Sequence, residues 1–339
     1  MGQPPGMETE WLLQWARRQA GPFLTRDAFG AGHSRRCISQ AVGSGLRDMG
    51  RGVLVSDQLW QASDARGRHR LLVAARLLQK SGRWVAARRS GAVFHGLPLL
   101  GDHAPEVPQL LRGLDGTRSN STDRHERIAE LEDSERTELY RVPVADLTRV
   151  VFDIAREEEL RSGLIVADGA LRRGMEKDAL EGMIRKRSSW PGAVAAMRVA
   201  QLANGLHETA LESLSWAACV TLGIPMPEPQ IRIYLGDKLL ARVDGLWREC
   251  NTVGQADGKY KYKSQLDVIK DKLQDESLED VGLEVVRWGW ASAYRADGDF
   301  LEKLERGFAR GRRQELDPRV KFVPTTLKES LTWTGLIAS

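Results

Sequence analysis

The chain has 339 residues, of which 42% are hydrophobic and 28% are charged. This composition is typical of a globular protein, and the length is too great for one ordinary core, so two or three domains are expected. Residues 1–100 contain fifteen Lys/Arg and six Asp/Glu, a net charge of +9, whereas residues 101–339 contain thirty-five and forty, a net charge of −5. A basic N-terminal third favours a polyanionic partner such as nucleic acid, although a merely solvated basic surface would give the same count.

The N-terminal segment, the apolar runs and the cysteines favour a soluble cytoplasmic protein with no membrane partner. The N-terminus, MGQPPGMETEW, lacks the basic and apolar regions of a signal peptide, and apolar runs such as LLVAARLL are too short and too charged to span a bilayer. The three cysteines, Cys37, Cys219 and Cys250, are far apart and form no CxxC pair, so neither a zinc site nor a disulfide framework is predicted. No glycine-rich segment is followed by GK[ST], and no organic cofactor is expected.

Residues 10–55 are predicted to form short helices followed by a two-stranded wing. Ser34 is a plausible N-cap for the helix RRCISQAV, whose Ile38, Ala41 and Val42 share one apolar face. Glycines end this helix, and LRDMGRGVLV is predicted to form two strands that turn at Gly50. The order of helix, helix, turn, polar-faced helix and wing is typical of a winged helix-turn-helix domain, with bounds of 1–65.

In that domain the polar face of the third helix would enter the major groove of duplex DNA. The candidate DNA-binding residues of this face are Arg35, Arg36, Ser39 and Gln40. In the wing, Arg47 or Arg51 would contact phosphate. The alternative is a small helical bundle whose arginines are only solvated.

Residues 66–200 are predicted to be mixed α/β and then helical. RHRLLVAARLLQKSG and RWVAARRSGAVFHGLPLLG are each predicted as one helix, PEVPQLLRGL as a strand, and residues 115–142 as a charged loop with an edge strand. Four helical segments follow from Asp146 onward. Asp153 and Asp168 lie inside these apolar segments, so we interpret them as capping or paired structural carboxylates. Residues 311–339 lose periodicity and are predicted to be a docked or loose tail.

The segment from Glu212 to Trp290 carries the candidate catalytic chemistry. It begins with a helix that contains Glu212, continues with a hairpin that carries Asp244 and Asp257, and ends with a charged helix and an apolar strand. This order can bring the carboxylates to one sheet edge. Converging oxygen ligands are what a hard divalent cation needs for phosphodiester cleavage.

Several segments, taken together over roughly 250 residues, resemble AbiEi-family antitoxins of type IV toxin–antitoxin systems. They are GRGVLV, GAVFHGLPLL, VPVADLTRVVFDIAR, VADGALRRG, LESLSWAACVTLGIPMPEPQ, RVDGLW, ADGKYKY and VVRW. The resemblance implies a DNA-binding transcriptional regulator that represses its own operon and opposes a toxin. It also implies a C-terminal domain of the very-short-patch-repair endonuclease type, within the PD-(D/E)xK nuclease fold.

Two of the family's motifs differ in this sequence. The usual strand reads Glu-x-Asp-Gly, and here it is Gln255-Ala256-Asp257-Gly258. The usual charged helix begins Glu-Lys-x-Arg, and here it is Asp271-Lys272-Leu273-Gln274. The patterns along the chain and the resemblance together predict a multidomain α+β or α/β fold. The expected domains are a winged helix over 1–65, a mixed domain over 66–200, a restriction-endonuclease-like α/β domain over 201–310 and a tail over 311–339.

Two arrangements of a nuclease site remain open. In the first, Asp244, Gln255 and Asp257 form the cluster, and Gln255 offers a neutral amide oxygen that weakens Mg²⁺ binding. In the second, Asp244 and Asp257 hold the metal, and Lys259 of the sequence Asp257-Gly258-Lys259 orients the attacking water. Glu212 could complete either site. We expect Glu212, Asp244 and Asp257 to lie close enough to share one cation, with Gln255 at the rim.

Other interpretations of these residues stay open as well. Asp244 and Asp257-Gly258 could merely shape hairpin turns, since Asp-Gly is a strong turn signal. The domain could also keep the nuclease fold without the chemistry, as a scaffold that binds DNA or a partner. Lys259 and Lys261, in a run that alternates with tyrosine, suit phosphate contact with base stacking or an ordinary solvated strand end. The sequence thus predicts a DNA-binding regulator with duplex DNA and a cognate toxin as partners, and the alternative is a Mg²⁺-dependent DNA endonuclease that a winged helix targets in phage defence or repair.

Overall fold

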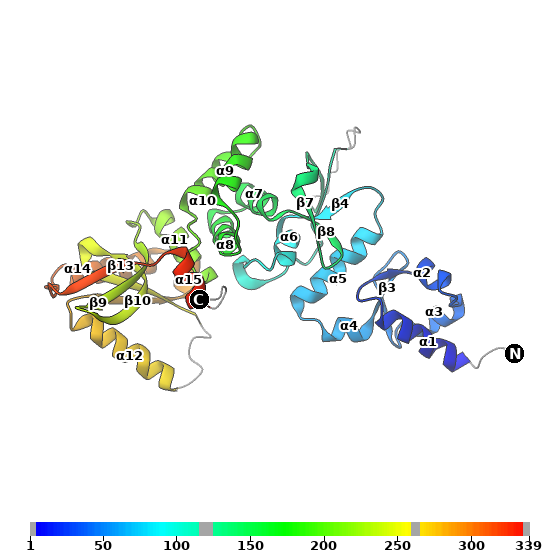
Figure 1. Cartoon of the computed structure of the whole chain (residues 1–339), viewed down its shortest axis with the longest axis horizontal. Helices are drawn as coiled ribbons and strands as arrows, with labels where there is room; N and C mark the ends of the chain where they lie inside the picture. The colour runs from blue at the N-terminus through cyan, green and yellow to red at the C-terminus, as the bar shows by residue number, and fades with distance from the viewer. Residues whose placement is uncertain (1–4, 115–124, 259–264, 335–339) are drawn as a thin grey trace. The chain divides into compact units, whose positions relative to one another are not determined.

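The computed structural model describes residues 5–114, 125–258 and 265–334 and is drawn in Figure 1. The chain forms two compact units, Met1–Ile154 and Ala155–Ser339, which are described separately below. It has a mixed α+β, multidomain fold, as the sequence predicts, with three sheets among the described residues. The division between the units lies within one helix and differs from the predicted boundaries after residues 65 and 200.

The first part of the N-terminal unit contains the short helices and the two wing strands predicted for residues 10–55, and one further strand that was not predicted. They are α1 (Pro5–Arg17), β1 (Phe23–Leu24), α2 (Thr25–Gly30), α3 (Arg35–Ala41), β2 (Leu46–Asp48) and β3 (Val53–Ser56). The three strands pair antiparallel in the order β1-β3-β2. Leu12, Ala28, Ile38 and Leu46 are buried together in a core that joins the helices to this sheet. Between β2 and β3 the chain turns through Gly50 and Gly52, both at positive φ, where glycine has no Cβ to clash.

The second part of this unit is a five-stranded sheet in the order β6-β5-β4-β8-β7. Its elements are α4 (Asp57–Ala62), α5 (Ala65–Leu78), β4 (Trp84–Ala86), α6 (Arg88–Phe94), β5 (Leu110–Arg112), β6 (Glu126–Ile128), β7 (Arg136–Leu139), β8 (Val142–Ala145) and α7 (Leu147–Glu157), which continues into the next unit. The single helix predicted to begin at Arg83 and to end at Gly96 and Pro98 is wrong, because Trp84–Ala86 is the central strand and only Arg88–Phe94 is α-helical. A buried run of three apolar residues has no periodicity that distinguishes a strand from a helix.

The C-terminal unit begins with helices that the sequence predicts correctly. They are α8 (Leu160–Leu171), α9 (Lys177–Lys186), α10 (Ala193–Leu202) and α11 (Ala210–Leu222). Ten consecutive residues of α8 are buried, because α10 and α11 both pack against it. This packing is the reason that residues 155–200 belong with the C-terminal sheet.

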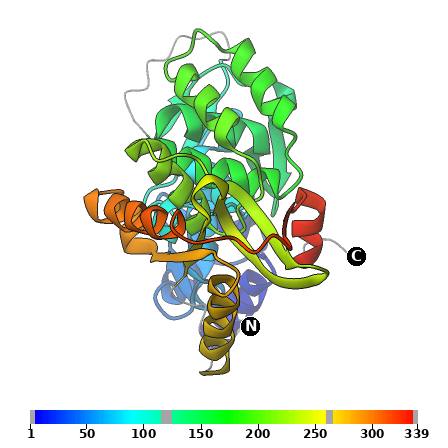
Figure 2. The same cartoon turned by 90° about the vertical axis from the view of Figure 1, so that its left-hand side faces the viewer.

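The C-terminal sheet has the strand order β12-β11-β10-β9-β13, in which only the pair β11–β12 is parallel. Its elements are β9 (Glu228–Leu235), β10 (Lys238–Trp247), β11 (Thr252–Asp257), α12 (Gln265–Glu279), β12 (Glu284–Gly289), α13 (Trp290–Arg295), α14 (Gly298–Gly311), β13 (Val320–Pro324) and α15 (Leu327–Trp333). On β12, Trp288 donates a hydrogen bond to Ser215 of α11, whereas the preceding Arg287 pairs with Asp275 of α12. Helices α11 and α12 therefore lie on opposite faces of the sheet. Helix α12 is the dark yellow helix in Figure 2.

The described part of residues 311–339, predicted to be a docked or loose tail, is docked on the C-terminal sheet. Strand β13 extends the sheet by pairing with β9, from Val320 opposite Leu235 to Pro324 opposite Ile231. The short helix α15 follows, with its N-terminus capped by Thr326 and Glu329. A proline at the end of an edge strand is tolerated because no further strand needs its missing N–H. Within the described part of the chain, no helix has the length and apolar character needed to cross a bilayer.

Candidate functional site

The polar face predicted for the third helix is exposed on α3. Ser34 caps the helix by accepting a hydrogen bond from the Cys37 N–H at 3.2 Å. Cys37, Ile38 and Ala41 are buried against the core. The structure places four predicted DNA-binding residues on the exposed side of this helix: Arg35, Arg36, Ser39 and Gln40.

The two candidate arginines of the turn between β2 and β3 have different surroundings. Arg51 is exposed within that turn. Arg47 is half-buried; its Nη2 lies 2.8 Å from Asp57 Oδ1, and its guanidinium lies 5.0 Å from the ring centre of Trp60. These contacts hold Arg47 against α4, so Arg51 is the better placed of the two to reach a ligand in solution.

In the C-terminal unit, the first carboxylate of the candidate site is Glu212, which is 5% exposed. It lies in the first turn of α11, where the Thr209 side chain caps the helix. Glu212 Oε1 accepts a hydrogen bond from Thr209 Oγ1 at 2.8 Å, and Oε2 accepts one from the Glu208 N–H at 2.9 Å. A carboxylate near a helix N-terminus is also stabilised by the helix dipole.

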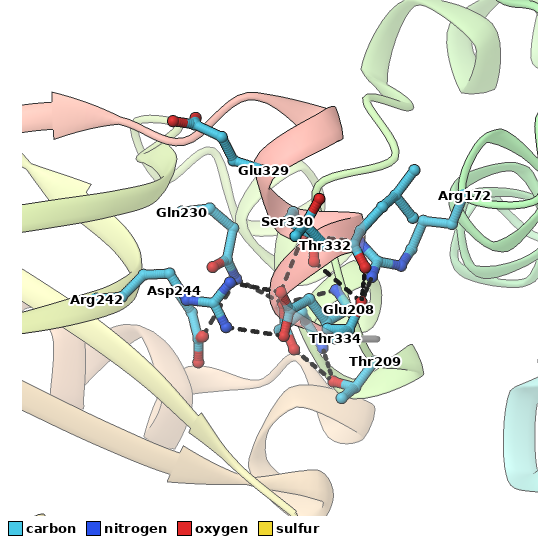
Figure 3. Close-up of polar contacts among 12 residues, drawn as sticks. Arg172, Glu208, Thr209, Gln230, Arg242, Asp244, Glu329, Ser330, Thr332 and Thr334 are labelled. Atoms are coloured by element: carbon cyan, nitrogen blue, oxygen red, sulfur yellow. Dashed lines mark hydrogen bonds and ion pairs between the residues drawn. The ribbon is translucent and has the colours of Figure 1, made fainter. Parts of the chain in front are cut away.

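The side-chain amide of Gln230 on β9 joins Glu212 to Asp244 of β10. Figure 3 labels Gln230 and Asp244. Gln230 Nε2 donates to Glu212 Oε2 at 2.9 Å and to Asp244 Oδ1 at 3.3 Å. The other oxygen of Asp244, Oδ2, accepts from the Ala256 N–H of β11 at 2.8 Å. Gln230 was not predicted as a site residue, since nothing in the sequence pattern distinguishes a buried glutamine near the start of a strand.

The backbone of Gln230 is strained. Its φ is +50°, in the left-handed region that costs a residue with a side chain about 1–2 kcal/mol. The Thr325 N–H donates to the Gln230 carbonyl at 3.0 Å, which holds this conformation from the end of β13. Strain that the surrounding structure maintains is a reason to look for a role of the side chain.

Burial and the neighbouring charge of Asp244 raise the pKa of Glu212 to about 7. A carboxylate in low dielectric resists ionisation, and a second carboxylate nearby adds to this resistance. Glu212 and Asp244 therefore hold one negative charge more readily than two at neutral pH.

The third predicted metal ligand, Asp257, forms an ion pair with an arginine. Arg287 of β12 lies 2.8 Å from Asp257 Oδ1 and also pairs with Asp275 and Asp271 of α12, at 2.7 and 3.6 Å. In the parallel pairing of β11 with β12, Gln255 lies opposite Arg287, and Asp257 follows two residues later on the same side. The guanidinium of Arg287 thus lies among three carboxylates, those of Asp257 on β11 and of Asp271 and Asp275 on α12.

The expected three-carboxylate cation site is accordingly not formed. Among residues 5–114, 125–258 and 265–334, no group of three His, Cys, Asp or Glu side chains is arranged to hold a metal ion. Gln255 is 4% exposed rather than at the rim. Lys259 and Lys261, which complete the D-x-K arrangement and the predicted phosphate contact, lie outside the described residues.

Asp153 and Asp168 are paired structural carboxylates, as predicted. In the N-terminal unit, Asp153 Oδ2 lies 2.8 Å from Nε of the fully buried Arg149. In the C-terminal unit, Asp168 accepts hydrogen bonds from the backbone N–H groups of Asn204 and Gly205 and from Ser213 Oγ, and it pairs with His207. Asp168 thereby fixes the loop that leads into the first turn of α11.

Next to α15, two arginines, Arg242 and Arg172, make hydrogen bonds beside the candidate site (Figure 3). Arg242 makes two hydrogen bonds to the carboxylate of Glu208, at 2.6 and 2.9 Å, and Ser330 of α15 donates to the same carboxylate. Arg172, the residue that follows α8, donates to Ser330 Oγ and Thr334 Oγ1, each at 3.0 Å. These contacts connect α8, β10 and α15 around the loop that carries Glu208.

The chain is similar to two uncharacterized proteins from two strains of Mycobacterium tuberculosis. Each is 24% identical over 161 residues, which is 47% of this chain and 59% of the relative. The chain thus matches less than two thirds of the length of these curated relatives. No protein-family model matches the chain.

Proposed function

We propose that the protein is a DNA-binding transcriptional regulator of the AbiEi antitoxin type, in which α1 to β3 form a winged helix-turn-helix domain. The observation that carries the proposal is the exposed face of α3, where Arg35, Arg36, Ser39 and Gln40 project away from a packed core. Arginine can pair with the O6 and N7 atoms of guanine, and glutamine with the N6 and N7 atoms of adenine. Such side chains on one helix face suit sequence reading in a major groove.

The wing and the charge distribution support the same proposal. Arg51 is exposed in the turn between β2 and β3, where a wing would meet the phosphate backbone. The +9 charge of residues 1–100 would favour association with duplex DNA through release of condensed cations. The resemblance further implies that the regulator represses its own operon in the cytoplasm and opposes a cognate toxin.

Binding to duplex DNA from the protein's own promoter region tests the proposal. Affinity is expected to fall steeply as salt rises, and Arg36→Ala or Arg35→Ala is expected to weaken binding by about 1–3 kcal/mol for a residue that reads a base. Arg51→Ala should weaken binding to all sequences alike and reduce the slope of log affinity against log salt by about 1. Fluorescence anisotropy at several salt concentrations measures both effects.

Arg198→Ala is the matched control, because Arg198 is an exposed arginine on α10 in the C-terminal unit. It should leave the affinity and its salt dependence unchanged. If Arg35→Ala and Arg36→Ala both bind as the wild type does, α3 is not at the interface and the proposal fails.

A second candidate function is a Mg²⁺-dependent endonuclease. The paired carboxylates Glu212 and Asp244 favour it, because oxygen ligands on adjacent elements are the usual setting for phosphodiester hydrolysis. Three observations oppose it: Gln230 lies between the carboxylates, Asp257 is paired with Arg287, and residue 255 is a neutral amide. The residues present do not fit a divalent cation, and the regulator is therefore the first proposal.

Incubation of plasmid DNA with the protein and Mg²⁺ or Mn²⁺ separates the two functions. We expect no cleavage by the wild type under conditions in which promoter binding is intact. Robust cleavage that disappears in both Asp244→Asn and Asp257→Asn would instead establish the endonuclease. Arg198→Ala again serves as the control for preparation and folding.

A further inference from the structure

Gln230 holds its side-chain amide where a cation shared by Glu212 and Asp244 would lie. Its Nε2 donates to one oxygen of each carboxylate, at 2.9 and 3.3 Å. The residue is 1% exposed, so water does not substitute for these bonds. An amide nitrogen carries two N–H donors, so it can partly offset the negative charge of two carboxylates, whereas a divalent cation offsets it fully.

We propose that Gln230 is an internal substitute for a divalent cation, which keeps the pair Glu212–Asp244 free of metal in the native protein. The orientation of the amide follows from electrostatics, because the reverse orientation would direct Oε1 at two acidic side chains. With Nε2 in this position, Oε1 is buried and has no hydrogen-bond partner among the described residues. The geometry leaves a cation no place unless the side chain moves.

The distances show what a cation would require. Ca²⁺ binds oxygen at about 2.3–2.6 Å and Mg²⁺ at about 2.0–2.1 Å. An ion at the position of Nε2 would draw the two oxygens inward by roughly 0.3–1.3 Å from their present 2.9 and 3.3 Å, depending on the ion. The elements that carry them could allow such a shift only after Gln230 is removed, since its side chain fills the space between them.

Two substitutions test the proposal in the full chain. Gln230→Gly removes the amide and suits the positive φ of +50°, whereas Gln230→Glu keeps the shape and adds a third carboxylate. Cation affinity depends on the number of charged ligands, so the dissociation constant for Mn²⁺ should fall on the order of tenfold or more from wild type to Gln230→Glu. Gln230→Gly should lie between them. Electron paramagnetic resonance of free Mn²⁺ measures binding, and Mn²⁺-dependent thermal shifts measure it independently.

Ala296→Gly is the matched control. Ala296 also has a positive φ, of 45°, but it lies at the end of α13, where it relieves backbone strain without touching the carboxylates. It should not change Mn²⁺ affinity. The double variant Glu212→Gln/Gln230→Glu should lose the gained affinity if the ion binds at this site.

Two outcomes would overturn the proposal. If wild type binds Mn²⁺ and Gln230→Gly binds it more weakly, Gln230 is a metal ligand through Oε1 rather than a substitute for the metal. If Gln230→Glu is folded by circular dichroism and binds Mn²⁺ no better than wild type, the amide only fills a hydrogen-bonding position in the core. Neither outcome depends on DNA binding by α3.

Discussion

Asp168→Ala is expected to lower the free energy of unfolding of the C-terminal unit by about 3–5 kcal/mol, because it removes one partner of a buried ion pair. Asp168 is 1% exposed, and its Oδ2 lies 2.7 Å from both His207 Nδ1 and Ser213 Oγ. Although burial alone would raise the pKa of Asp168, the charge and hydrogen bond of His207 hold it below its ordinary value. The folded state therefore stabilises the ionised carboxylate, and alanine would leave His207 and three other donors unsatisfied.

Denaturant unfolding at pH 7, followed by tryptophan fluorescence, measures this loss. Trp216 reports locally, since its ring centre lies 4.3 Å from that of His207. Asp168→Asn should cost less, about 1–3 kcal/mol, because its amide oxygen can still accept from Asn204 and Gly205. The exposed Asp178→Ala should change stability by less than about 1 kcal/mol. Equal losses for Asp168→Ala and Asp178→Ala would show that the buried network contributes no stability of its own.

The helices were predictable because their signals are local. Apolar periodicity over residues 147–222 predicted the helical segments from α7 to α11, and Ser34 was identified as a cap from its position before α3. A helix closes its hydrogen bonds within four residues, so the sequence around it contains most of what defines it. Strand β4 was missed because three buried residues, Trp84 to Ala86, carry no such repeat.

The candidate site was predictable only in part. Glu212 and Asp244 converge as expected, since a helix followed by a hairpin brings them to neighbouring elements. The ion pair of Asp257 with Arg287 was not predicted, because the register of the parallel pair β11–β12 places Arg287 there. Register depends on packing between segments distant in sequence, which alternation within one strand does not reveal. Gln230 was missed for a similar reason, as its positive φ and its burial depend on β13 and α11.

The carboxylate pair Glu212–Asp244 makes the stability of the folded protein depend on pH. Glu212→Gln is expected to gain stability relative to wild type by roughly 3 kcal/mol as the pH rises from 4.5 to 8. The side chain can keep most of its bonds, because the new amide oxygen can accept from Gln230 and Glu208 while the new amide nitrogen faces Thr209 Oγ1. The difference between the two proteins then reports the cost of ionising Glu212 in the folded state.

The sign follows from the direction of the shift. The pKa of Glu212 is raised from 4.5 to about 7, so between these values the folded protein keeps a proton that the unfolded chain has released. Stability falls with pH wherever the native state binds more protons, and wild type therefore loses stability as the pH rises through this window. Glutamine has no proton to release and lacks this loss.

Urea unfolding of both proteins at half-unit pH intervals measures the difference. Glu305→Gln on α14 is the control, because Glu305 is exposed and should give a difference that does not vary with pH. The His207–Asp168 pair contributes its own pH dependence, which is present in both proteins and largely cancels in the comparison. A difference between wild type and Glu212→Gln that stays flat from pH 4.5 to 8 would mean that Glu212 ionises in the folded protein as easily as in water, and that Gln230 bridges two full negative charges.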